Sequence, residues 1–159
     1  MTVRRIILIE SNDLVRGALR GLLEGSGHAV TDFRSGVEGL AGIVADRPSA
    51  AIVGIGLDER GGYEMARRVR LALGRTIFLI AVSGHGQEAD RVMALSAGFD
   101  AHLIKPVSIE LVERVLDGIP DRRRQAVERP RLITRKSTSS TTAPMNATKI
   151  VPPRPLNGT

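Results

Sequence analysis

The sequence predicts an α/β protein built on a parallel β-sheet with helices on both faces. Short apolar runs of strand length alternate with stretches of helical period along the first 119 residues. Several of these runs are almost continuously hydrophobic, which is typical of parallel strands buried on both faces. Strict alternation of strand and helix requires right-handed crossover connections, and these place the helices on either side of the sheet.

Five strands are expected from the apolar runs. In chain order they are Ile6–Ile9, Ala29–Phe33, Ala50–Ile55, Ile77–Val82 and Ala101–Ile104. The third run lies in the stretch AAIVGIGLDERGGYE, where Gly54 stands just before a polar loop. In such sheets the working crevice lies at the carboxyl ends of the strands, so the residues that follow each run are the site candidates.

Five helices are predicted from apolar residues spaced three or four positions apart. The positions expected to face the sheet are Leu14, Val15, Ala18, Leu19, Leu22, Met65, Val69, Leu73, Val92, Leu95, Ala97, Leu111, Val112, Val115 and Leu116. The expected N-caps are Ser11 or Asn12 for the first helix, Ser35 in a capping box with Glu38 for the second, and Ser108 for the fifth. The expected helix stops are Gly25, Gly74 and Gly98.

Composition excludes several classes of function. Cysteine is absent, so neither disulfides nor thiol chemistry is available. The N-terminal stretch MTVRRIILIE is too short for a signal sequence or a membrane span, and a cytoplasmic protein without a membrane partner is expected. No GxGxxG or Walker motif occurs, and His28, His85 and His102 lack metal-ligand spacing, so we do not expect an enzyme.

Charge divides the chain near residue 120. Residues 1–119 contain 14 Arg/Lys and 15 Asp/Glu, a balance of −1, whereas residues 120–159 contain 9 and 2, a balance of +7. The second segment also has 6 of the 8 prolines, the run KSTSSTT and no apolar period. We therefore predict a domain over 1–119 and a basic, largely disordered tail over 120–159. Two interpretations of the tail stay open: binding of nucleic acid or an acidic partner, or a solvated extension that binds nothing specific.

Three stretches resemble the receiver domain of bacterial two-component response regulators. They are RIILIESNDLVRGALRGLLE, GYEMARRVR and AVSGHGQEADRVMALSAGFDAHLIKPV. The resemblance covers residues 4–118, about three quarters of the chain. It implies the CheY-like, flavodoxin-like fold, a five-stranded parallel sheet in the order 2-1-3-4-5 flanked by five helices. It also implies a role in two-component signal transduction.

The resemblance assigns five site positions to this sequence. Receivers hold Mg²⁺ with two adjacent acids after the first strand, and Glu10 and Ser11 occupy those places. The place of the phospho-accepting aspartate, at the end of the third strand, is Gly54. The Ser or Thr that ends the fourth strand matches Ser83, and the lysine before a proline matches Lys105. The resemblance therefore implies a degenerate site in which the acceptor and one acid are absent.

Phosphoryl transfer to a receiver needs an oxygen nucleophile and a divalent ion. Gly54 supplies no nucleophile, and Glu10 alone is a weak candidate for Mg²⁺, so we expect no phosphoacceptor, no catalytic residue and no cofactor. The alternative is an acceptor relocated to Asp58 or Ser11. For Lys105 we expect an ion pair with Glu10 across the crevice, the alternative being that it extends into water.

The leading hypothesis is a pseudo-receiver that acts by phosphorylation-independent protein interaction within a two-component, phosphorelay-type pathway. His102 occupies the position of the aromatic switch residue of receivers. By resemblance, the contact face comprises the fourth helix, the fifth strand and the fifth helix, with Arg91, His102 and Arg114 as candidates. The alternatives are partner binding by the tail, phosphorylation at a relocated site, and small-ligand binding in the crevice.

Overall fold

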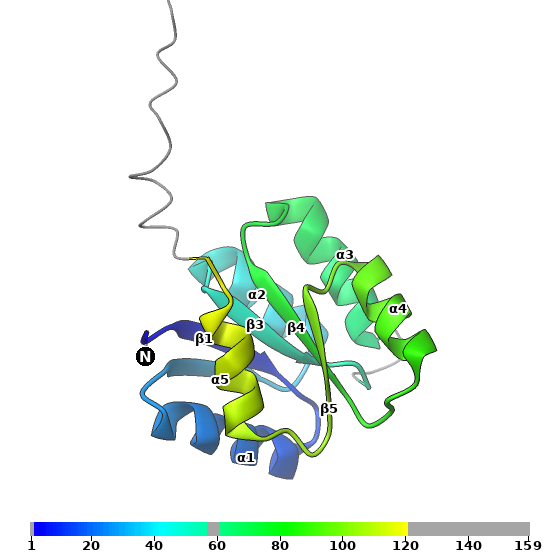
Figure 1. Ribbon diagram of the computed structural model, residues 1–159. Helices are drawn as coiled ribbons and strands as arrows, with labels where there is room; N and C mark the ends of the chain where they lie inside the picture. The colour runs from blue at the N-terminus through cyan, green and yellow to red at the C-terminus, as the bar shows by residue number, and fades with distance from the viewer. Residues whose placement is uncertain (1, 57–60, 121–159) are drawn as a thin grey trace, which may run out of the picture. The chain divides into compact units, whose positions relative to one another are not determined.

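The computed structural model describes residues 2–56 and 61–120 of the 159-residue chain. These residues form one parallel sheet with the strand order β2-β1-β3-β4-β5, and helices lie on both of its faces (Figure 1). The strands are β1 (Arg5–Ile9), β2 (Ala29–Phe33), β3 (Ala50–Gly54), β4 (Phe78–Ser83) and β5 (Ala101–Ile104). The helices are α1 (Asp13–Gly25), α2 (Gly36–Asp46), α3 (Gly61–Leu73), α4 (Glu88–Ala97) and α5 (Ile109–Asp117). The predicted fold and strand order are confirmed.

Two sequence-based expectations fall on residues outside this description. Asp58, considered as a relocated acceptor, belongs to the segment 57–60. The predicted tail lies outside it from residue 121 onward, so the boundary near residue 120 and the tail's function stay predictions. Among the described helices, none combines the length and apolar character that a membrane crossing requires.

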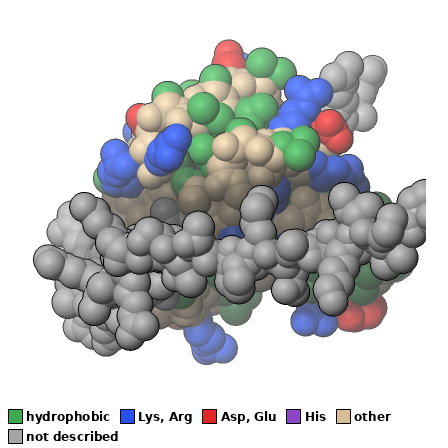
Figure 2. All heavy atoms as spheres, turned by 90° about the horizontal axis from the view of Figure 1, so that it is seen from above, with side chains coloured by type: hydrophobic (Ala, Val, Ile, Leu, Met, Phe, Trp, Pro, Cys, Tyr) green, Lys and Arg blue, Asp and Glu red, His purple; other side chains and the backbone are tan. Residues whose placement is uncertain are grey.

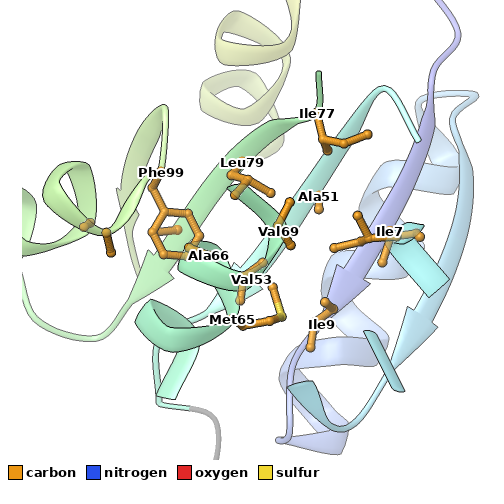
Figure 3. Packing of buried hydrophobic residues seen from close by; sticks show 14 residues of the cluster. Ile7, Ile9, Ala51, Val53, Met65, Ala66, Val69, Ile77, Leu79 and Phe99 are labelled. Carbon is orange, nitrogen blue, oxygen red and sulfur yellow. The ribbon is translucent and has the colours of Figure 1, made fainter. Parts of the chain in front are cut away.

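Two hydrophobic cores lie on opposite faces of the sheet because successive strand residues point in opposite directions. On one face Ile7 and Ile9 of β1 pack with Val53, Met65 and further residues of α2, α3 and α4 (Figure 3). On the other face the alternate strand residues pack against α1 and α5. The sheet is therefore covered on both sides, as the continuous apolar runs predict.

The helix faces differ from the sequence prediction at several positions. Leu14 is 86% exposed, and Val92, Leu95 and Leu111 are also exposed. In α4 the buried residues are the small Ala94 and Ala97, so the helix approaches the sheet through its smallest side chains. Apolar spacing alone marks a stripe wider than the one the sheet covers, which is why the larger residues at the stripe's edge were misassigned.

The predicted N-caps are confirmed. The Asn12 side chain, rather than that of Ser11, accepts from the backbone N–H of Val15 at the start of α1. Ser35 and Ser108 accept in the same way at the starts of α2 and α5. Gly98 ends α4 with φ 113°, a conformation that side-chain-bearing residues rarely adopt.

Arg47, at the end of α2, has the same left-handed type of backbone conformation, with φ 45° and ψ 66°. A side chain is strained in this region, whereas glycine is not. We expect Arg47→Gly to raise the free energy of unfolding by about 0.5–1 kcal/mol in urea titrations. Arg67→Gly, on the exposed face of α3, is the matched control and should lower it by about 1 kcal/mol. Destabilisation by both variants would contradict the assignment.

Arg70 of α3 is hydrogen-bonded to residues of two loops, the one before β4 and the one between α4 and β5. Its guanidinium donates to the backbone oxygens of Gly98 at 2.8 Å and Ile77 at 2.7 Å. It also pairs with the Asp100 carboxylate at 2.7 Å, and that carboxylate accepts from the backbone N–H of Leu79. The Arg70 side chain is only 13% exposed, so these bonds lie largely out of water.

His28 lies buried between the beginning of the chain and α5. Its Nδ1 accepts from the backbone N–H of Arg4 at 3.2 Å. Its Nε2 lies 2.7 Å from a carboxylate oxygen of Glu113 in α5. The Arg4 side chain adds a bond to the backbone oxygen of Ile119. α5 and the segment after it are thereby joined by hydrogen bonds to Arg4, just before β1, and to His28, just before β2.

Candidate functional site

The site lies at the carboxyl ends of β1, β3, β4 and β5, where the strand pairing brings residues distant in sequence together. Glu10 follows β1, Gly54 ends β3 and Ser83 ends β4. Lys105 follows β5, and its backbone N–H donates to the oxygen of Ser83 at 2.8 Å. The parallel topology therefore places four of the five predicted site residues at one edge of the sheet.

Glu10 is a buried carboxylate with a partner on each oxygen. Oε2 accepts from Lys105 Nζ at 3.0 Å, and Oε1 accepts from the backbone N–H of Asn12 at 3.0 Å. The Glu10 side chain is 6% exposed, compared with 32% for Lys105. The predicted ion pair between these two residues is confirmed, across 95 positions of sequence. A buried carboxylate held in this way is paired and hydrogen-bonded, as burial of charge requires.

Gly54 is in close contact with the same carboxylate. A Cβ at position 54 would lie 2.6 Å from Glu10 Oε2, and the three nearest atoms to it all belong to the Glu10 carboxyl group. The backbone of Gly54 has no positive φ, so its conformation would accept any residue. Glycine is favoured here because a side chain would meet the Glu10 carboxyl group, and not because of the backbone conformation.

Ser83 joins the site to His102 on β5. The Ser83 hydroxyl donates to the backbone oxygen of His85 at 2.7 Å, and its Oγ lies 2.8 Å from His102 Nε2. A hydroxyl has one proton, which the His85 carbonyl receives because it is only an acceptor. His102 Nε2 must then carry a hydrogen and donate it to Ser83. The residue at the predicted switch position is thus bonded directly to the end of β4.

Ser11, at the second acid position, is exposed. Beside it, Arg16 of α1 donates to the backbone oxygen of Glu10 at 2.9 Å and pairs with Asp13 and Asp32. The hydrogen bond from Arg16, followed by the charge of Arg34, lowers the pKa of Asp13 below its usual value. Sequence reasoning did not single out Arg16, because a lone arginine among the apolar positions of a helix resembles a solvated charge.

The residues of the predicted contact face lie in α4, β5 and α5. Arg91 is exposed and pairs with Glu88 one turn earlier, and Arg114 is exposed on α5. Five large apolar side chains are also exposed on these elements, namely Val92, Met93, Leu95, Ile104 and Leu111. Basic side chains on the face seen in Figure 2 stand at several separate places, in keeping with the near-neutral balance of residues 1–119.

The donors around Glu10 bear on magnesium binding at this site. Mg²⁺ in proteins takes oxygen ligands and prefers one or two carboxylates. Glu10 directs both carboxylate oxygens to donors, and one of these donors, Lys105, is a cation. Within the described part of the chain, no three His, Cys, Asp or Glu side chains gather as a metal site would need.

The sheet order and the position of the site define a flavodoxin-like α/β domain with a polar site at the carboxyl edge of its sheet. Residues 6–117 match the profile of the response regulator receiver domain family. The chain belongs to this family of two-component signalling domains.

Individual relatives agree with this assignment. The chain is 34% identical over 101 residues to the transcriptional regulatory protein CseB of Streptomyces coelicolor, covering 64% of this chain and 42% of CseB. It is 31% identical over 106 residues to the response regulator MprA of Mycobacterium avium, covering 67% of this chain and 46% of MprA. The chain thus spans less than half the length of these two relatives.

A solved structure is similar over nearly its whole length. It is the receiver domain of the sensor histidine kinase PA1611 from Pseudomonas aeruginosa PAO1, with a magnesium ion coordinated in its active-site cleft. The identity is 25% and the TM-score 0.68, over 74% of this chain and 98% of that domain. The fold of this chain is therefore that of a receiver of ordinary size.

Proposed function

We propose that this receiver works without a phosphoryl group at the end of β3 and signals by protein interaction within a two-component pathway. The observation that carries the proposal is the carboxylate of Glu10, which lies against Gly54 and is paired with Lys105. Position 54 supplies no nucleophile, and the space in which an acceptor side chain would lie is filled. In-line phosphoryl transfer depends on a positioned nucleophile, so this arrangement favours a receiver without an acceptor there.

The residues at the magnesium positions of receivers support the same proposal. The PA1611 receiver holds the ion in its cleft. Where that ion is bound, it neutralises the charge that develops on a transferring phosphoryl group. In this chain Glu10 is held by Asn12 and Lys105, and Ser11 contributes no carboxylate, so we propose that the ion has no functional part here.

The face of α4, β5 and α5 is the surface that we propose for the protein partner. Its exposed apolar side chains, Val92, Leu95, Ile104 and Leu111, offer area that a partner would remove from water. His102 of β5 is half-buried and is hydrogen-bonded to Ser83 of the site. A ligand can shift a conformational equilibrium only through contacts that differ between the two states, and a partner on this face would make such contacts.

The test is incubation of the full chain with radiolabelled acetyl phosphate, with and without Mg²⁺. We expect no magnesium-dependent label on the wild type. The matched variant carries aspartate at three positions, Glu10→Asp, Ser11→Asp and Gly54→Asp, and should gain label, since the shorter side chain at position 10 vacates the space beside residue 54. Label on the wild type, at Asp58, Ser11 or elsewhere, would overturn the proposal and support a relocated acceptor.

A further inference from the structure

The carboxylate of Glu10 occupies space that a side chain on β3 would otherwise use. Its Oε2 lies 2.6 Å from the place that a Cβ of residue 54 would take. The Cβ of an aspartate at position 54 would therefore collide with the Glu10 carboxylate. The two positions can supply one carboxylate to this place, from β1 or from β3, but not both at once.

Lys105 has two fixed contacts: its side chain pairs with the Glu10 carboxylate, and its backbone is hydrogen-bonded to the end of β4. Lys105 Nζ donates to Glu10 Oε2 at 3.0 Å, and the backbone N–H of Lys105 donates to Ser83 at 2.8 Å. Ser83 is in turn bonded to His102. The Glu10–Lys105 ion pair thus joins the loop between β5 and α5 to the end of β1.

Glu10 is itself held firmly enough to position another group. Its Oε1 accepts from the backbone N–H of Asn12, and its backbone oxygen accepts from Arg16. The residue is 4% exposed, so its carboxylate has little water to exchange partners with. A buried carboxylate in a defined position makes a stronger contact with an ammonium group than an exposed one does.

We propose that Glu10 is a built-in replacement for a carboxylate on β3, and that its charge positions Lys105, the loop after β5 and the Ser83–His102 contact. Glu10 is in this account a positioning residue for the signalling surface. The inference deepens the proposed function, because a charge fixed in the chain would do permanently what a charge at position 54 would otherwise do. Glu10 and Gly54 compensate for each other, because the long Glu10 side chain supplies the carboxylate that residue 54 lacks.

The test moves the carboxylate from β1 to β3 in the full chain, with EDTA and no phosphoryl donor present. The variants are Glu10→Gln, Glu10→Ala, Glu10→Ala with Gly54→Asp, and Glu10→Ala with Gly54→Asn. The last two differ only in charge, and in both the obstructing Glu10 carboxyl is gone. Glu24→Gln removes a carboxylate from the exposed pair with Arg20 and serves as the matched control. The readouts are the hydrogen exchange rate of the Lys105 amide and the ring ¹⁵N shifts of His102.

We expect Glu10→Ala to speed exchange of the Lys105 amide about tenfold and to shift the His102 signals, because a hydrogen bond to a charged group is lost. The added Gly54→Asp should return the exchange rate to within about twofold of the wild type, whereas Gly54→Asn should not. Exchange unchanged from the Glu24→Gln control in both Glu10→Ala and Glu10→Gln would overturn the proposal. Equal recovery by asparagine and aspartate would overturn it as well.

If circular dichroism shows that Glu10→Ala does not fold, the comparison of Glu10→Gln with Glu24→Gln decides alone. Faster exchange in Glu10→Gln then supports the proposal, and equal exchange rejects it. These results are independent of the labelling experiment, since no donor is present. Phosphorylation of the wild type would reject the proposed function, while exchange rates that do not respond to Glu10 would reject only the role assigned to this residue.

Discussion

Gly54→Asp in the otherwise unchanged chain is expected to lower the free energy of unfolding by about 2–4 kcal/mol. The new Cβ would lie 2.6 Å from Glu10 Oε2, so either Glu10 or β3 must move. The substitution also places a second carboxylate beside one that is already buried, and two like charges so close together disfavour each other. Urea unfolding followed by circular dichroism measures the loss.

Gly84→Asp provides the comparison for this substitution. Gly84 is exposed at the end of β4, and a Cβ there would meet no atom within 4 Å. Its free energy of unfolding should stay within about 0.5 kcal/mol of the wild type. Equal stability of Gly54→Asp and Gly84→Asp would show that the Glu10 carboxylate moves aside freely, contrary to the packing described here.

Arg70→Ala is the second substitution with a large expected effect, a loss of about 2–4 kcal/mol in the free energy of unfolding. The guanidinium donates to three backbone oxygens, those of Gly74, Ile77 and Gly98, and pairs with Asp100. Its removal leaves these acceptors short of a donor in a region that is largely shielded from water. Chemical denaturation at neutral pH gives the measurement.

Arg67→Ala is the control in the same helix. The Arg67 side chain is 56% exposed and its nitrogen lies 3.7 Å from the Glu64 carboxylate, a surface pair. Such pairs contribute between about 0 and 1 kcal/mol. A loss for Arg70→Ala no greater than that for Arg67→Ala would mean that Asp100 and the neighbouring carbonyls find other donors.

The elements of the fold follow from local features of the sequence. Most strands are short apolar runs. The caps Ser35, Ser108 and one of Ser11 or Asn12 were predicted because such side chains compete for backbone N–H groups within three residues. The Glu10–Lys105 pair was also predicted, from the chemistry of two opposite charges at the carboxyl ends of strands in one parallel sheet. Predictions of this kind succeed where the partner is close in sequence or fixed by the topology.

The details of the site depend on side-chain reach, which no local pattern encodes. Nothing near Gly54 in the sequence indicates that Glu10 extends into its space, because a carboxylate one methylene longer than aspartate is needed to do so. The bond between Ser83 and His102 likewise depends on how β4 and β5 pair. Arg70 was missed for the same reason, since its acceptors come from two loops, the one before β4 and the one before β5.

The contacts of His28 also make its ring a natural magnetic resonance probe for the position of α5. Because Nδ1 accepts from Arg4, the ring hydrogen must reside on Nε2 and be donated to Glu113. The ring is therefore held as a single neutral tautomer, and its two nitrogens should give widely separated ¹⁵N resonances. If α5 moved away when a partner bound, Nε2 would lose its acceptor, so magnetic resonance could follow that displacement without any added label on the surface.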